Sequence, residues 1–169
     1  MWTETYAQIM DRAIIERLKE DEFSKLGNAA DKAATARRQA EELEAAARQY
    51  ISEMQAGEIN HIPYEHLRFH DHGVDAKMPD TVDGCLSELA RVHRLYWETQ
   101  TKVQEIKKRI AHVRAAGRYD GLGLLDFYLL QLIIDSCNQK RNEVRTHCDF
   151  LFGKEHLSFA EAIHEMAQR

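Results

Sequence analysis

Hydrophobic residues along the chain repeat at alternating spacings of four and three, which places them on one face of an α-helix. The repeat is most regular in two segments, from about Ala29 to Gln55 and from about Asp80 to Ala116. Alanine dominates the row of the first segment: Ala29, Ala33, Ala36, Ala40, Leu43, Ala47, Tyr50 and Met54. Larger residues make up the row of the second: Cys85, Leu89, Val92, Tyr96, Thr99, Val103, Ile106, Ile110 and Val113. Heptad rows of this length predict helices that pack against other helices.

The same spacing predicts two more long helices, from about Thr3 to Leu26 and from about Leu122 to Phe152. Their rows are Tyr6, Ile9, Met10, Ala13, Ile14 and Leu18 in the first, and Leu130, Ile134, Cys137, Arg141, Val144, Cys148 and Leu151 in the second. Glycines stand at the expected ends of all four helices: Gly27, Gly57, Gly117 and Gly153. Asn28 and Asp80 are candidate N-caps for the second and third helices. A single bent helix that continues through Gly27 remains an alternative.

The end of the chain carries a further helix-start signal. Ser158-Phe-Ala-Glu161 matches the capping box, and it predicts a short helix from Phe159 to the end. Short turns join the first helix to the second and the third to the fourth, which favours antiparallel neighbours. We therefore predict an all-α fold, an antiparallel bundle of four long helices plus a short C-terminal helix, in a single domain over residues 1–169.

The one long break in this pattern is the connection over residues 57–80, which contains both prolines and four of the nine histidines. Imidazole and carboxylate groups suit zinc or another transition metal. Four residues of the connection are therefore candidate ligands of a divalent metal: His66, His70, Asp71 and His72. No H-E-x-x-H signature supports this site. Histidines of a polar loop that cap, stack or point outward are the simpler interpretation.

Composition narrows the classes of function. Hydrophobic residues make up 44% of the chain, and the net charge is −5 with a pI near 6.0, which argues against a broad nucleic-acid-binding surface. No run of apolar residues is long enough to span a membrane. The first residues lack a secretory signal, and the three cysteines form no C-x-x-C pair. We therefore expect a cytoplasmic protein whose cysteines belong to the core.

Charged and amide side chains gather on the predicted fourth helix. Arg141 stands within the apolar row, and the stripe beside the row is Asp135, Asn138, Asn142, Arg145 and Asp149. An arginine in a packed row needs a carboxylate partner, because an unpaired buried charge is strongly destabilising. The stripe is a buried polar network that fixes helix register, or a face of the bundle that meets solvent or another subunit, or else a pocket that binds a small anionic ligand through Arg141 and Arg145. His93, Trp97 and Glu98 on the third helix are candidates for the same pocket.

Two motifs on these helices resemble a bacterial helical family catalogued as a domain of unknown function. Leu89, His93, Trp97 and Glu98 form the first motif, with His93 where the family pattern has asparagine. The second is Ile-Asp-x-x-Asn-Gln-x-Arg-Asn, which begins at Ile134. The resemblance covers residues 86–152. It implies a helical fold and no activity, and it implies importance for a polar cluster of Asp135, Asn138, Arg141 and Asn142.

Two functions fit these patterns. The first is a non-enzymatic interaction or assembly module, since heptad rows readily serve the formation of a homo-oligomer. The alternative is a small-ligand protein or a metal-dependent nucleotide- or phosphate-handling enzyme. It would use the polar cluster of the fourth helix, with a divalent metal as a possible cofactor. We expect the first, with a second copy of the chain as partner and with neither nucleic acid nor membrane. The residues by themselves do not decide whether the chain is an enzyme.

Overall fold

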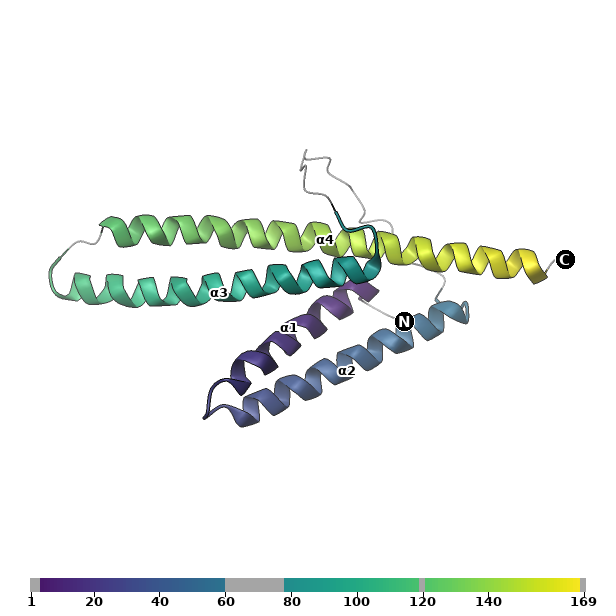
Figure 1. Cartoon of the computed structure of the whole chain (residues 1–169), viewed down its shortest axis with the longest axis horizontal. Coiled ribbons are helices and arrows are strands. Elements are labelled where there is room, and N and C mark those ends of the chain that lie inside the picture. Colours follow the sequence, from purple (N-terminus) through teal and green to yellow (C-terminus); the bar gives the residue numbers. More distant parts are fainter. Residues whose placement is uncertain (1–3, 60–77, 119–120, 168–169) are drawn as a thin grey trace. The chain divides into compact units, whose positions relative to one another are not determined.

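The computed structural model describes residues 4–59, 78–118 and 121–167, and side chains within these ranges as far as Gly153. These residues form four α-helices and no strand: α1 (Tyr6–Ser24), α2 (Ala30–Gln55), α3 (Val82–Ala115) and α4 (Gly121–Ala167) (Figure 1). The predicted all-α class is therefore confirmed. None of these four helices is long and apolar enough to cross a membrane.

The chain divides into two compact units. The first comprises residues 1–90 and 143–169, so it contains α1, α2, the first turns of α3 and the last part of α4. The second comprises residues 91–142, which are the remainder of α3 and the first half of α4.

Threonine side chains determine where two of the helices begin. Thr5 starts α1 with a capping box: its hydroxyl accepts a hydrogen bond from the Gln8 amide, and the Gln8 side chain accepts one of 2.8 Å from the Thr5 amide. Thr81 occupies the corresponding place before α3, where its Oγ1 accepts a hydrogen bond of 3.0 Å from the amide of Gly84. Thr81, and not the predicted Asp80, is thus the N-cap of α3.

Glycines end two helices as predicted, but the turn between α1 and α2 differs from the prediction. Gly57 and Gly117 follow α2 and α3 with φ of 72° and 70°, a conformation that residues with a Cβ rarely adopt. Gly27 has no positive φ, and α1 and α2 are two separate helices rather than one bent helix. The N-cap of α2 is Ala29, which makes no side-chain cap hydrogen bond, so Asn28 is not the cap.

α4 continues beyond Gly153, where a helix end and a separate short helix from Phe159 were predicted. That prediction is wrong, because one helix spans Gly121–Ala167. A glycine inside a helix costs only about 1 kcal/mol relative to alanine. Gly153 is buried, and most residues that follow it are good helix formers. The Ser158–Glu161 segment therefore lies within a helix rather than at the start of one.

All four helical segments of the first unit contribute to one core. Its buried residues are Tyr6, Ala7 and Ile9 from α1, Ala47 and Tyr50 from α2, Val82, Cys85 and Leu89 from α3, and Val144, Cys148 and Phe152 from α4. The ring of Phe152 stacks on Tyr6 with 4.1 Å between centroids and lies 6.0 Å from Tyr50. The rows predicted for α1 and α2 are all buried or half-buried and are thus confirmed.

The second unit is a helical hairpin in which α3 lies beside α4 (Figure 1). The predicted rows face inward, with Val92, Thr99 and Val103 of α3 and Ile134 and Cys137 of α4 at most 5% exposed. Two contacts join the helices farther along. The Lys107 ammonium lies 5.6 Å from the centroid of the Phe127 ring, and the Arg109 guanidinium lies 3.5 Å from Asp126 Oδ2.

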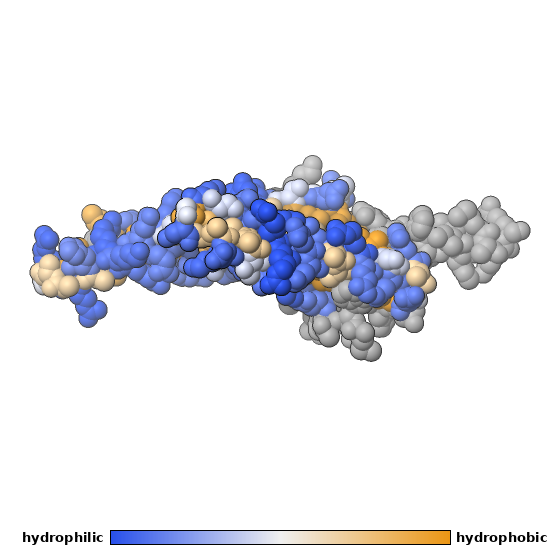
Figure 2. All heavy atoms as spheres, turned by 90° about the horizontal axis from the view of Figure 1, so that it is seen from below, coloured by the Kyte–Doolittle hydropathy of each residue, from blue (hydrophilic) through white to orange (hydrophobic). Residues whose placement is uncertain are grey.

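The outward faces of the helices are mainly hydrophilic. On α2, five charged residues opposite the alanine row are exposed: Lys32, Arg38, Glu41, Glu42 and Arg48. On the face drawn in Figure 2, hydrophilic residues cover most of the described surface, and hydrophobic residues lie in smaller patches between them. The stretch of α4 from Leu122 to Ile133 differs, because several of its large hydrophobic side chains are exposed.

Candidate functional site

The predicted metal ligands His66, His70, Asp71 and His72 lie outside the residues that the structure describes. Within the described ranges, no group of three or more histidine, cysteine, aspartate or glutamate side chains is placed to hold a metal ion. A metal site in the 57–80 connection therefore stays a prediction.

The polar residues predicted on α4 in the second unit lie mostly at the surface. Asp135, Asn138 and Asn142 are exposed, and Arg141 is half-buried. Asp135 accepts a hydrogen bond of 3.4 Å from the Gln131 side chain one turn earlier. Arg141 and Asn142 both have interaction partners. The stripe is thus a largely solvated face of the helix along this stretch.

The three candidates on α3 also lie in the second unit, but they differ in exposure. His93 is buried, Trp97 is half-buried and Glu98 is exposed. His93 and Trp97 are four residues apart and share one side of the helix, whereas Glu98 lies about 100° further round. The structure therefore groups the first two and separates the third.

Asp149, the last residue of the predicted stripe, links α4 to the start of α1 within the first unit. Its Oδ2 accepts a hydrogen bond of 2.6 Å from the Thr5 hydroxyl, and its Oδ1 accepts one of 2.9 Å from the Ala7 amide. The carboxylate thus meets the N-terminus of a helix, where unpaired N–H groups and the helix dipole favour negative charge. Burial raises the pKa of Asp149, while the bonds from Thr5 and Ala7 and the charge of Arg145 act in the opposite direction.

A second polar link between α1 and α4 involves Asp11, which is only 1% exposed. Its Oδ2 lies 3.8 Å from Nη1 of Arg145. Asp11 was not predicted as a functional residue, although it lies between Ala7 and Ile14 on the apolar face of α1. A carboxylate in an apolar row needs a buried partner, and this signal was available in the sequence.

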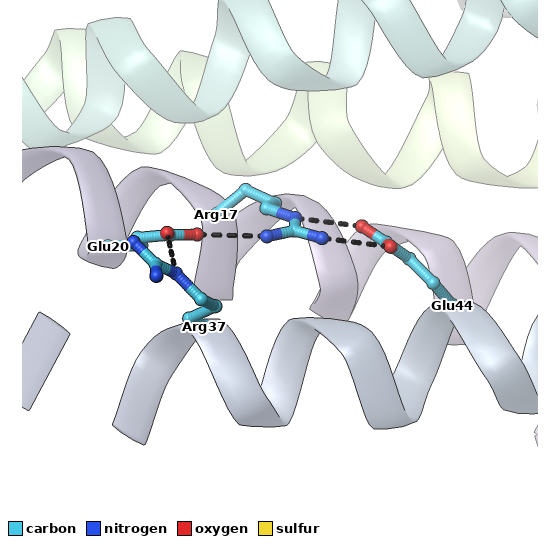
Figure 3. A network of polar contacts seen from close by, with 4 residues as sticks. All are labelled: Arg17, Glu20, Arg37 and Glu44. Atoms are coloured by element: carbon cyan, nitrogen blue, oxygen red, sulfur yellow. Dashed lines mark hydrogen bonds and ion pairs between the residues drawn. The ribbon is translucent and has the colours of Figure 1, made fainter. Parts of the chain in front are cut away.

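Four charged residues join α1 to α2 in the first unit (Figure 3). The Arg17 guanidinium donates hydrogen bonds of 2.8 and 2.9 Å to Glu44 and one of 2.9 Å to Glu20. Glu20 accepts a further bond of 2.6 Å from Arg37. The bonds from Arg37 and Arg17 lower the pKa of Glu20, and the bonds from Arg17 lower the pKa of Glu44. Each charge has a partner inside the network, as expected of a link that fixes the register of two helices.

We expect the Arg17–Glu44 pair to show a coupling energy of about 0.5–1 kcal/mol in a double-mutant cycle of Arg17→Gln and Glu44→Gln. The reason is that the Arg17 guanidinium on α1 donates two hydrogen bonds to the Glu44 carboxylate on α2. Urea denaturation at low salt measures the free energy of unfolding. The Arg38–Glu42 pair within α2 is the matched control, since its side chains are 67% and 64% exposed. Its coupling should stay below about 0.5 kcal/mol. Equal values for the two pairs would contradict the expected difference.

One row of hydrophobic residues on α4 was not predicted. Leu122, Leu125, Leu129 and Leu132 are 76, 53, 49 and 45% exposed. These four residues, the α4 leucine row, are spaced by three, four and three and therefore share one face of the helix. Tyr128 and Ile133 flank the row and are 59 and 40% exposed. The sequence signal was a second heptad spacing, offset from the buried row of the same helix.

A groove of about 310 Å³ lies beside the leucine row in the second unit. Its lining residues are Arg91, Val92 and Leu95 from α3, and Leu132, Ile133, Ser136, Cys137 and Lys140 from α4. Burial raises the pKa of the Cys137 thiol, and the charge of Arg91 opposes this only in part. The thiol is therefore protonated at neutral pH and is a poor nucleophile. The groove offers a mainly apolar surface beside an uncharged cysteine.

A second groove, of about 360 Å³, lies between α1 and α2 and is more polar. Its lining residues are Glu16, Lys19, Phe23, Asp31, Lys32, Thr35, Ala36 and Gln39. Lys19 donates a hydrogen bond of 2.7 Å to Glu16 Oε1, and the Lys32 ammonium lies 5.9 Å from the centroid of the Phe23 ring. The Oε2 atom of Glu16 is buried and has no hydrogen-bond partner within the described chain. Both lysines thus contact other residues of the groove.

Comparison with known proteins adds no assignment to this geometry. No protein-family model, no curated protein and no solved structure matches the chain. The resemblance of two motifs to a bacterial helical family therefore stays a hypothesis, and the function is argued from the residues and their arrangement.

Proposed function

We propose that this chain is a non-enzymatic interaction and assembly module, an antiparallel helical bundle that associates with its partner through α4. The observation that supports this most directly is the α4 leucine row. A helix that is hydrophobic on all sides is normally buried. A contiguous hydrophobic patch left at a surface is typical of an interaction site. The exposed face of α4 therefore suits a protein partner.

The two faces of α4 differ in exposure along the same stretch of helix. Ile134 and Cys137 are 3 and 5% exposed and belong to the inward row. Leu129 and Leu132, on the outward side, are 49 and 45% exposed. Removing hydrophobic surface from water favours association. The inward face of α4 is already buried in the hairpin. The hydrophobic side chains of its outward face are still in contact with solvent, and burying them against a partner would favour binding.

The polar residues favour a scaffold as well. Arg145 and Asp149, two members of the predicted stripe, form links between α1 and α4 in the first unit. The three cysteines are all buried, and no disulfide joins them. Buried thiols fit a reducing compartment, and we propose the cytoplasm as the location of the protein.

The mass of the full chain in solution tests this proposal. One chain has a mass of 19.6 kDa, and we expect light scattering to give at least twice this mass at tens of micromolar. Leu125→Lys places a charge in the centre of the row and should give a monomer, because burying an unpaired charge is costly. Gln104→Lys on the exposed face of α3 is the control and should leave the mass unchanged.

Two results would contradict the proposal. One is a wild-type chain that stays at 19.6 kDa over the whole concentration range. The other is a rise of several degrees in Tm with a nucleotide, a sugar phosphate or Mg²⁺ that Arg141→Met abolishes, because a ligand that binds the native state raises its stability. The second result would favour the alternative function of a phosphate-handling enzyme.

A further inference from the structure

We propose that the end of the α3–α4 hairpin binds the surface of a membrane that contains anionic lipids, a property that goes beyond the proposed assembly function. α3 ends and α4 begins at this end of the second unit (Figure 1). Exposed leucines and exposed cations lie there together, a combination typical of proteins that bind at the surface of an anionic membrane. The hairpin end comprises five exposed residues: Arg114, Arg118, Leu122, Leu124 and Leu125.

The leucines of the first turn of α4 surround the helix instead of forming one row. Leu122, Leu124 and Leu125 are 76, 41 and 53% exposed. Since successive residues of a helix differ by about 100°, Leu122 and Leu124 lie about 160° apart around the axis, with Leu125 between them. A partner helix along the α4 leucine row would cover Leu122 and Leu125 but would leave Leu124 in solvent. A lipid interface covers all three, because it surrounds the end of a hairpin.

Tyr128 extends this apolar surface along the side of Leu124. It follows Leu124 by four residues, so the two share one side of α4, and it is 59% exposed. Tyrosine has an apolar ring and a polar hydroxyl, which suits the boundary between the hydrocarbon and the headgroups of a membrane. The leucines would therefore enter the interface, and Tyr128 would lie at the level of the headgroups.

The net charge around the hairpin end is opposite in sign to that of the whole chain. Residues 102–126 contain six lysines and arginines and three acidic residues, which gives a net charge of +3. The whole chain has a net charge of −5, so the remaining residues carry −8. The six cations of this segment are all exposed: Lys102, Lys107, Lys108, Arg109, Arg114 and Arg118. This asymmetry favours an anionic partner at this end of the molecule.

Contacts within the chain account for only some of these cations. Arg109 lies 3.5 Å from Asp126, and the Lys107 ammonium lies 5.6 Å from the centroid of the Phe127 ring. The other four take part in no ion pair within the described ranges. The helix dipole favours a cation in the last turn of α3, where Arg114 lies, but its effect does not reach back to Lys108.

This contact would lie at the surface of a membrane and would not cross it. None of the four described helices is long and apolar enough to span a bilayer. A membrane partner was not expected from the sequence, because no apolar run has the length of a spanning helix. Binding at the surface needs no such run, since a few inserted side chains and the attraction between opposite charges supply it.

Cosedimentation of the full chain with lipid vesicles tests the charges. Vesicles of phosphatidylcholine with about one third phosphatidylserine should bind the chain at low salt, and vesicles of phosphatidylcholine alone should not. Arg114→Gln and Arg118→Gln should each lower the partition coefficient about fivefold, because each removes one cation near the anionic surface. Arg94→Gln is the matched control. Arg94 is exposed roughly 30 Å farther back along α3, so its loss should change the partition coefficient less than about twofold.

Leu124→Ser tests insertion and separates this surface from assembly. It should lower the partition coefficient about tenfold, because it removes an apolar side chain from the interface. It should leave the mass in solution unchanged, since Leu124 is not part of the α4 leucine row. Leu132→Ser is the control: Leu132 has a similar exposure of 45% and lies roughly 12 Å farther along α4. It should leave vesicle binding by the monomer within about twofold of wild type.

Other outcomes would contradict the inference or the proposed function separately. A wild-type chain that does not cosediment with anionic vesicles at low salt overturns the membrane surface, whatever its mass. Vesicle binding that Leu124→Ser leaves unchanged overturns insertion of the leucines. Tight binding of a DNA oligonucleotide that Arg118→Gln weakens and Leu124→Ser does not would assign the cations to nucleic acid instead. A monomer that binds anionic vesicles overturns the assembly function alone.

Discussion

Phe152→Ala is expected to lower the free energy of unfolding by about 3–5 kcal/mol, the largest effect of a single substitution that we predict. Phe152 is 3% exposed in the core of the first unit. Its ring stacks on Tyr6 at an interplanar angle of 9° and also contacts Tyr50 at 6.0 Å between centroids. Truncation therefore removes contacts from α4 to both α1 and α2 and leaves a cavity between helices.

Urea denaturation followed by circular dichroism measures this effect. Phe150→Ala is the matched control, because Phe150 is half-buried on the same helix and its ring faces His147 of that helix at 6.3 Å. We expect it to cost less than half as much. Phe152→Leu retains most of the side-chain volume and should cost no more than about 1.5 kcal/mol. If the two alanine variants lost the same stability, the stacked ring would not be a central part of the core.

Asp149→Ala is expected to cost about 2–3 kcal/mol of stability, the second largest effect. The substitution leaves the Thr5 hydroxyl and the Ala7 amide without their acceptor at the N-terminus of α1. Unmade hydrogen bonds of partly buried groups carry a desolvation cost that solvent does not fully return. Asp149→Asn keeps an acceptor oxygen of similar shape, so we expect it to cost about half as much or less.

The pH dependence of the free energy of unfolding, compared between wild type and Asp149→Asn, gives a second measurement. Burial raises the pKa of Asp149 in the folded state above its ordinary value of 3.8. A raised pKa of an acid contributes stability that is fully present below 3.8 and is lost as the pH rises through the folded-state pKa. Wild type should therefore lose stability relative to Asp149→Asn as the pH rises through this window. A difference that does not change with pH would show that the carboxyl is not buried as described.

Periodicity predicted the helices and their buried rows because both depend on residues within a few turns of one another. Cys85, Leu89 and Val103 were placed on one row of α3 from spacing alone, and all three are at most 1% exposed. The predicted helix end at Gly153 was wrong for a physical reason. A single glycine lowers helix stability only slightly, so it ends a helix only where the residues after it do not favour helix. The residues after this buried glycine favour continuation of the helix.

The polar contacts between helices could not be predicted from the sequence, because they join residues from distant parts of the chain. Asp149 was predicted as part of a polar stripe, but its acceptor role for Thr5 spans 144 positions. The bonds from Arg17 to Glu44 cross from one helix to the next, and no spacing within either helix predicts them. The leucine row was not predicted either, although its spacing of three, four and three is visible in the sequence.

The sequence by itself determined that this protein is helical and that each of its four long helices has an apolar row. These properties follow from helical periodicity, which is local. Only the tertiary structure decided that a second hydrophobic row of α4, from Leu122 to Leu132, stays exposed, and which carboxylates link helices. Burial and pairing depend on segments that come together from distant positions, and they place Asp11 and Asp149 in contacts between α1 and α4 while the leucine row stays exposed.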